Sequence, residues 1–139
     1  MAENRILGID PGEKNIGLAI SDPTGTIANP LMVIEHTSRD ADARRIVRIA
    51  GEQGAAKIIV GQAQDWNGGI SYQGRKAARL AHAIEDRTDL PVELWNEYGS
   101  TQRAREARRR MGVPRKKRGG HLDQIAATVI LQSYLDNQE

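Results

Sequence analysis

Residues 5–12 read Arg5-Ile6-Leu7-Gly8-Ile9-Asp10-Pro11-Gly12, a short apolar run that ends in a carboxylate followed by Pro-Gly. The apolar run is typical of a buried strand, and Pro-Gly predicts a turn after which residues 16–21 return as a second strand. Asp10 therefore stands at the end of a strand. Burying an unpaired charge is costly, so such an Asp meets a cation, a hydrogen-bond donor or solvent. Two interpretations stay open here: Asp10 caps the turn, or it belongs to a functional site.

The order of the other segments predicts an α/β fold. Pro30 interrupts the third apolar run and cannot donate to a strand ladder, so this strand is expected at a sheet edge. Ser38 and Gly54 are typical start and stop residues of a helix, and residues 22–25 (Asp-Pro-Thr-Gly) predict a hairpin turn. Hairpin-connected strands followed by alternating helices and strands give a mixed sheet flanked by helices. The predicted strands are 5–10, 16–21, 27–34, 56–61 and 92–95, and the predicted helices are 39–53, 71–89, 101–112 and 122–135.

Length and composition bound the protein class. A chain of 139 residues is long enough for one packed core and too short for two ordinary domains, so we expect a single domain over residues 1–139. The chain contains no Cys, which excludes disulfides and thiolate metal sites. Neither a signal-peptide pattern nor a long uninterrupted apolar stretch is found in it, so we expect a cytoplasmic protein that does not contact membranes.

The charges are unevenly distributed. The whole chain carries only +2, but residues 103–118 contain nine basic residues against one acid, Glu106. A clustered basic stretch favours a polyanionic partner, because phosphates are the usual target of such a surface. We refer to this segment as the basic stretch and predict that it binds nucleic acid; its basic residues are Arg103, Arg105, Arg108, Arg109, Arg110, Arg115, Lys116, Lys117 and Arg118.

Three acids fall where predicted elements begin or end. Asp10 follows the first strand, Glu97 follows the last strand, and Asp123 stands early in the last helix. Asp123 alone could be a first-turn acid favoured by the helix dipole. Together, three hard oxygen donors without partner His or Cys suit Mg²⁺ or Mn²⁺. Two such ions can activate a water and stabilise the departing oxygen of a phosphodiester, so the sequence predicts a metal-dependent phosphodiesterase.

Five stretches of the chain carry a resemblance to a known family: residues 8–22 (GIDPGEKNIGLAISD), 58–61 (IIVG), 96–101 (NEYGST), 122–127 (LDQIAA) and 131–135 (LQSYL). Together they resemble the YqgF (RuvX) family. This resemblance implies an RNase H-like fold, a two-metal nuclease mechanism, and similarity to Holliday-junction resolvases of the RuvC type. It also implies a role in maturing the 5′ end of pre-16S ribosomal RNA, and it assigns the family's acids to Asp10, Glu97 and Asp123.

The chain departs from the family pattern at two expected arginines, where it has Asn15 and Tyr98. Neither side chain can clamp a phosphate as a guanidinium does. Lys14, Arg75 and the basic stretch are therefore the predicted phosphate contacts. Asp65, beside Asn67-Gly68-Gly69, is either a fourth acid or a turn residue.

Three functions stay open on the sequence alone. The first is a nuclease acting on pre-rRNA or on branched DNA, as a monomer or as a homodimer, with two paired active sites needed for junction resolution. The second is a binding module that has lost catalysis, which the missing arginines favour. The third is a sugar-kinase or actin-like ATPase, which the Gly8–Gly12 turn also resembles. The short chain argues against the third function, because such ATPases bind nucleotide between two related domains.

Overall fold

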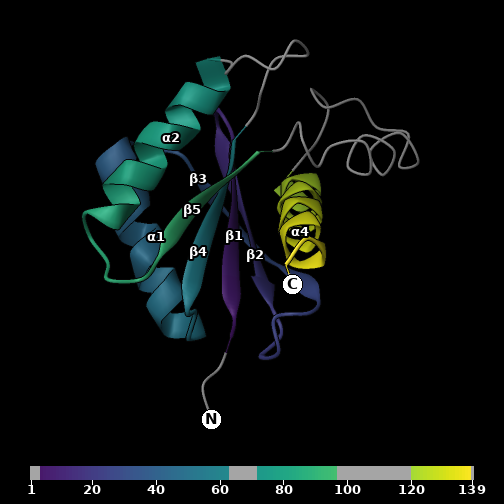
Figure 1. Cartoon of the computed structure of the whole chain (residues 1–139). Helices are drawn as coiled ribbons and strands as arrows, with labels where there is room; N and C mark the ends of the chain where they lie inside the picture. The colour runs from purple at the N-terminus through teal and green to yellow at the C-terminus, as the bar shows by residue number, and fades with distance from the viewer. Residues whose placement is uncertain (1–3, 63–71, 97–119, 139) are drawn as a thin grey trace.

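The computed structural model describes residues 4–62, 72–96 and 120–138, and Figure 1 shows their arrangement. The predicted helix 101–112 lies outside these ranges, so its prediction is not tested. The elements in chain order are β1 (Ile6–Pro11), β2 (Asn15–Ser21), β3 (Ala28–Glu35), α1 (Arg39–Gln53), β4 (Lys57–Gln62), α2 (Tyr72–Glu85), β5 (Val92–Asn96) and α4 (Gly120–Asp136).

The five strands form one mixed sheet in the order β3-β2-β1-β4-β5. The first three strands are antiparallel, whereas β4 runs parallel to β1 and β5 runs parallel to β4. The five-stranded mixed sheet predicted from the sequence is thus confirmed. β3 is an edge strand, as Pro30 predicted, and its register against β2 shifts between Leu18 and Ala19, next to that proline.

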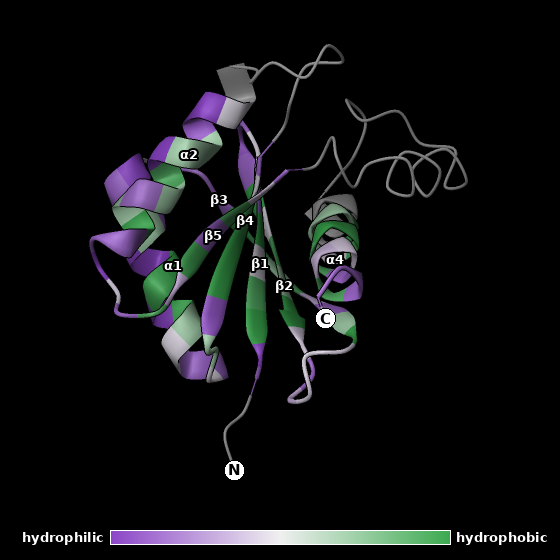
Figure 2. Cartoon of the chain, viewed as in Figure 1, coloured by the Kyte–Doolittle hydropathy of each residue, from purple (hydrophilic) through white to green (hydrophobic). Residues whose placement is uncertain are grey.

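Helices cover both faces of the sheet. α1 and α2 pack together on one face, and α4 is the helix that the described residues place on the other (Figure 1). The strands between them are the most apolar part of the molecule (Figure 2), and their side chains form two buried clusters, one on each face. No helix in the described ranges is long and apolar enough to cross a membrane.

Strand β1 divides its residues between the two faces. Leu7 and Ile9 are fully buried in the cluster beneath α1 and α2. Alternation along a strand turns Gly8 and Asp10 to the opposite face, toward α4. A Cβ atom at Gly8 would lie 2.8 Å from Cβ of Leu131, which is closer than two carbons can approach. Glycine at this position therefore allows α4 to lie directly against the centre of the sheet.

The two ends of α1 agree with the sequence prediction. Ser38 is the N-cap, and its side chain accepts a hydrogen bond from the backbone N–H of Ala41. Gly54 ends the helix with a φ of 67°, a left-handed conformation that glycine adopts without strain.

The prediction for the end of α2 was wrong. The sequence suggested a helix as far as about residue 89, but α2 ends at Glu85. Beyond it, the N–H of Arg87 donates to the carbonyl of Ile84, and the Thr88 hydroxyl accepts a hydrogen bond from the N–H of Leu90. The first is a backbone bond that tightens the chain after the helix, and the second is a local side-chain bond of the kind that competes with helix formation. Together they turn the chain toward Pro91 earlier than the apolar periodicity indicated.

The turn between β2 and β3 is the predicted hairpin turn. The N–H of Gly25 donates to the carbonyl of Asp22, and Gly25 has a φ of 72°. The carboxylate of Asp22 accepts hydrogen bonds from the N–H groups of Ile27 and Thr26 and from the Thr24 hydroxyl. These bonds, the one from Ile27 foremost, hold the pKa of Asp22 well below its usual range.

The C-terminal half of α4 is attached to β4 and β5 by a small polar cluster. The amine of Lys57 donates to the Glu93 carboxylate at 2.6 Å and to the Tyr134 hydroxyl. It also lies 5.0 Å from the centre of the Tyr134 ring, which meets Trp95 edge to face. Burial opposes the charge of Lys57, but its hydrogen bonds to Glu93 and Tyr134 outweigh burial and raise its pKa. This cluster lies at the end of the sheet away from Asp10.

The contact between Gly8 and α4 gives a stability prediction. We expect Gly8→Ala to lower the free energy of unfolding by about 1–3 kcal/mol, because the added methyl group overpacks against Leu131. Gly51→Ala is the matched control, since a Cβ at this helical glycine meets nothing within 4 Å; it should stabilise by about 0.4–1 kcal/mol. Urea denaturation measures both changes. Equal stability of Gly8→Ala and the unsubstituted protein would contradict the close packing.

Candidate functional site

Asp10 is the one predicted catalytic acid whose side chain the structure describes. It lies near the end of β1 on the face covered by α4, and only 5% of its surface is exposed. It is one of three buried polar side chains in the described ranges, with Ser21 and Asp42. A carboxylate in such a place is costly unless cations or donors surround it. This burial favours the interpretation that Asp10 belongs to a site over the one in which it merely caps a turn.

Glycines flank Asp10 on both neighbouring strands. Gly17 is its partner in the antiparallel register with β2. On the other side, Gly61 directly follows Val60, which pairs with Ile9. Because both neighbours are glycines, β2 and β4 contribute only backbone atoms beside the carboxylate. A Cβ at Gly61 would also come within 3.1 Å of Ile130, so this glycine serves the packing of α4 as well.

The other predicted acids are described in part or not at all. Residue 123 lies in the first turns of α4, but its side chain is outside what the structure describes. Glu97 directly follows β5, and both Glu97 and Asp65 fall outside the described residues. Within the described residues, no group of three His, Cys, Asp or Glu side chains comes together that could hold a metal ion. The full ligand set therefore remains a prediction.

The predicted phosphate contacts lie on different parts of the molecule. Lys14 is exposed in the turn between β1 and β2, beside the end of Asp10's strand. Arg75 is exposed on α2, in the helical layer on the other face of the sheet. All basic residues of the basic stretch lie outside the described ranges. The structure thus brings Lys14 near the end of β1, and it does not bring Arg75 to the face that Asp10 occupies.

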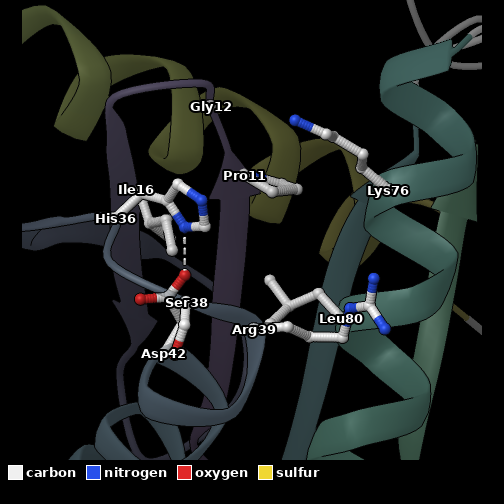
Figure 3. Close-up of a pocket in the computed structure, with 9 residues that line it drawn as sticks. All are labelled: Pro11, Gly12, Ile16, His36, Ser38, Arg39, Asp42, Lys76 and Leu80. Atoms are coloured by element: carbon white, nitrogen blue, oxygen red, sulfur yellow. Dashed lines mark hydrogen bonds and ion pairs between the residues drawn. The ribbon is translucent and has the colours of Figure 1, made fainter.

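A pocket of about 200 Å³ lies on the side of β1 opposite to Asp10. Figure 3 shows the side chains around it. They come from the end of β1 and the turn after it, from the start of β2, from the segment that joins β3 to α1, from the first turn of α1, and from α2. Its lining residues are Pro11, Gly12, Ile16, His36, Ser38, Arg39, Asp42, Lys76 and Leu80.

Asp42 is the buried acid of this pocket, with 1% of its surface exposed. Its carboxylate accepts a hydrogen bond from Nδ1 of His36 and another, of 3.1 Å, from the N–H of Thr37. The N–H of His36 in turn donates to the carbonyl of Lys14 at 2.8 Å. These bonds tie the start of α1 to the end of β3 and to the β1–β2 turn.

Sequence reasoning missed this cluster, although one signal was available. Asp42 shares the apolar face of α1 with Ile46 and Ile49, at the i, i+4 and i+7 positions. An acid on a buried helix face needs a partner. That the partner is His36, six residues earlier in a different segment, cannot be deduced from spacing.

The fold places the protein in a structural class. A five-stranded mixed sheet of this order, with helices on both faces and an acid at the end of the first strand, is the RNase H-like fold of nucleases and resolvases. The structure is similar to T. thermophilus RuvC in complex with a Holliday junction substrate, with a TM-score of 0.59 and 16% identity over 96% of this chain and 94% of that one. It is also similar to the fowlpox virus Holliday junction resolvase, with a TM-score of 0.56, 18% identity, and coverage of 96% and 99%.

The sequence assigns the family within this class. The sequence model of RuvX, described as a Holliday junction resolvase, matches residues 4–137. The chain therefore belongs to the RuvX family, a nuclease family. It is 38% identical over 133 residues to a protein of Desulforamulus reducens that is named "Putative pre-16S rRNA nuclease", covering 96% of this chain and 97% of the relative. A relative of the same name in Thermoanaerobacter pseudethanolicus is 39% identical, with 97% and 98% covered.

The bonds to Asp42 predict its contribution to stability. Asp42→Asn should lower the free energy of unfolding by about 1–3 kcal/mol, because it weakens the buried bond to His36. Asp40→Asn is the matched control in the same helical turn: Asp40 is 70% exposed and meets Arg87 at 3.0 Å, a surface pair worth at most about 1 kcal/mol. Thermal and urea unfolding would measure both variants. A loss no larger than that of Asp40→Asn would show that the His36–Asp42 pair does not stabilise the fold.

Proposed function

We propose that this RuvX-family protein is a metal-dependent nuclease that processes the 5′ end of pre-16S rRNA in the cytoplasm. The observation that carries the proposal is the buried carboxylate of Asp10, between two glycines at the end of β1. The names of the relatives, which match over nearly their whole length, support this substrate.

The register of the sheet supports Glu97 as the second acid. Gly61 pairs with Trp95 in the parallel ladder, and Trp95 packs with the cluster beneath α4. Residue 97 directly follows β5, which ends at Asn96. β5 is separated from β1 by one strand, so their backbones lie about 10 Å apart. This separation supports the proposal that an acid directly after β5 shares a pair of metal ions with Asp10.

Helical spacing supports Asp123 as the third acid. Residue 123 precedes Ala127 by four positions and Leu131 by eight, and both of those residues are fully buried against the sheet. Residues four apart share one stripe of an α-helix. α4 packs along β1, with Leu131 against Gly8. The start of α4 therefore lies at the same end of the sheet as Asp10.

The donor set of these three residues fits Mg²⁺ or Mn²⁺. All are carboxylates, which are the hard oxygen ligands that these cations prefer. When bound, such ions would activate the attacking water and stabilise the leaving oxygen. The protein's own contribution would be to position these carboxylates and to hold the substrate phosphates with Lys14 and the basic stretch.

A Holliday junction is the second candidate substrate. It is favoured by the description of the family and by the likeness of the fold to RuvC. Resolving a junction requires two active sites that cut opposite strands, and therefore a homodimer, whereas processing of an rRNA end can be performed by a monomer. A panel of labelled pre-16S fragments, single-stranded RNA and four-way DNA junctions, incubated with Mn²⁺ or Mg²⁺, separates the two candidates by which member is cut.

The role of Asp10 predicts a loss of cleavage with retention of the fold. Asp10→Asn should reduce metal-dependent cleavage at least about a hundredfold, because it removes a charged metal ligand with almost no change in shape. Asp86→Asn, an exposed acid after α2, is the control and should cleave normally. Circular dichroism checks the fold of both. Near-normal cleavage by Asp10→Asn would exclude Asp10 as an essential ligand.

The basic stretch predicts a change in salt dependence. Replacing Arg108, Arg109 and Arg110 with Glu should weaken nucleic-acid binding irrespective of sequence and reduce the slope of log K against log salt by roughly one unit per lost contact. Fluorescence anisotropy at several salt concentrations measures the slope. An unchanged slope would mean that these arginines are merely solvated. If the unsubstituted protein binds nucleic acid but neither takes up Mn²⁺ in calorimetry nor cuts the panel, the protein is a binding module and the nuclease proposal fails.

A further inference from the structure

The turn between β1 and β2 connects Asp10, the proposed metal ligand, to Lys14, the proposed phosphate contact four residues later. Only residues 12–14 separate the two strands. A Cβ atom at Gly12 would clash with the backbone carbonyl oxygen of Asn15, so the turn closes tightly on itself. The course of this turn decides where Lys14 stands relative to the end of β1.

A backbone hydrogen bond holds the turn from outside the two strands. The N–H of His36 donates to the carbonyl of Lys14 at 2.8 Å. This bond continues the β2–β3 ladder by one step beyond the pair of Asn15 and Glu35. His36 lies in the exposed segment 36–38, which joins β3 to α1 and belongs to neither. The bond to Lys14 therefore requires that this segment be held in place.

Asp42 holds that segment through the side chain of His36. Its carboxylate accepts a hydrogen bond from Nδ1 of His36, dashed in Figure 3, and one of 3.1 Å from the N–H of Thr37. Asp42 is anchored in turn, because it is 1% exposed and lies one helical turn before Ile46, which is buried in the core. The core therefore holds α1, Asp42 holds His36, and His36 holds the carbonyl of Lys14.

The strands beside the turn have supports that do not involve the His36–Asp42 bond. The pairing of β1 with β2 continues to the last residue of β1. Arg45 of α1 donates to the carbonyl of Glu35, the last residue of β3, at 3.2 Å. We therefore expect loss of the His36–Asp42 bond to loosen the turn and to leave the sheet intact.

We propose that His36 and Asp42 are positioning residues for substrate binding: their bond holds the β1–β2 turn so that Lys14 is presented to a backbone phosphate of nucleic acid bound at Asp10. This inference rests on the proposed nuclease function, in which Lys14 contacts phosphate. A long, flexible side chain binds well only when its backbone is already in place, because ordering the backbone as well adds to the entropy cost of binding. The pair therefore acts on the affinity for nucleic acid.

Rescue by a conservative variant tests the role of the pair. All variants are made in the Asp10→Asn background, so that a labelled single-stranded RNA is bound and not cut, and fluorescence anisotropy measures its dissociation constant. His36→Ala should raise that constant about fivefold and lower the salt slope by about 0.7, the value for one lost contact to a single strand. His36→Asn should stay within about twofold of the parent, because its amide nitrogen is as many bonds from Cβ as Nδ1 and can donate to Asp42. Equal constants for His36→Ala and His36→Asn would overturn the proposal.

Ser21→Ala is the matched control for stability. The buried Ser21 hydroxyl accepts a hydrogen bond of 2.8 Å from the N–H of Ile6, at the opposite end of β2 from the turn. Its loss should lower the free energy of unfolding in urea as His36→Ala does, but leave the dissociation constant within about twofold of the parent. An equal rise of the constant in Ser21→Ala and His36→Ala would overturn the proposal. Circular dichroism checks the fold, and Asp42→Asn, which weakens the same bond, replaces His36→Ala if that variant does not fold.

A double-mutant cycle tests whether the pair acts through Lys14. Lys14→Ala by itself should raise the dissociation constant for the RNA about fivefold. Adding His36→Ala to it should raise the constant by less than about twofold more, because the contact that His36 positions is already lost. Additive losses in the double variant, or no loss in Lys14→Ala, would overturn the proposal.

Backbone relaxation in nuclear magnetic resonance reports on the turn without any ligand. The order parameter of the Lys14 amide should be about 0.85 in the parent and in His36→Asn, and below about 0.6 in His36→Ala. An unchanged order parameter would overturn the proposal. None of these readouts depends on cleavage. Coupling of His36 to Lys14 in a protein that cuts no nucleic acid would refute the nuclease proposal alone, and a nuclease in which His36→Ala binds RNA like the parent would refute the positioning role alone.

Discussion

The close packing of α4 against the centre of the sheet is the constraint on which the rest of the structure depends. It is possible because β1 and β4 present Gly8 and Gly61 to the helix, where a Cβ would meet Leu131 at 2.8 Å and Ile130 at 3.1 Å. Protein interiors are packed nearly as tightly as crystals and tolerate little added volume. The glycines therefore fix the distance of α4 from the sheet, and with it the distance of the first turn of α4 from the end of β1.

Strand β1 separates two chemical environments. Alternation along β1 turns Asp10 to the α4 face, while the next residue, Pro11, faces the pocket on the other side. Each environment has a buried carboxylate, but the two differ in their surroundings. Asp42 is held by His36 and Thr37, which fits a structural acid that ties the start of α1 to the segment before it. Asp10 has Gly17 and Gly61 on the neighbouring strands and is the acid that we propose as a metal ligand.

Local signals in the sequence predicted most of the fold. Ser38 and Gly54 bounded α1 to the residue, Pro30 identified the edge strand, and Asp22 with Gly25 identified the hairpin turn. Each of these depends on the conformational limits of one residue or on a bond to a near neighbour. The end of α2 was misplaced because hydrogen bonds at Arg87 and Thr88 compete with an apolar periodicity that continues past Glu85.

By itself, the sequence determined the five strands, the helices that cover them, the place of Asp10 at a strand end, and the family to which the chain belongs. The reason is that strand and helix periodicity, turn residues and caps act over short distances along the chain. Only the tertiary structure decided that Asp10 is buried between two glycines and that α4 lies against Gly8. It also decided that His36, Arg39, Asp42 and Lys76 surround one pocket. These facts depend on which segments pack together across the sheet, and residue spacing along the chain does not encode that pairing.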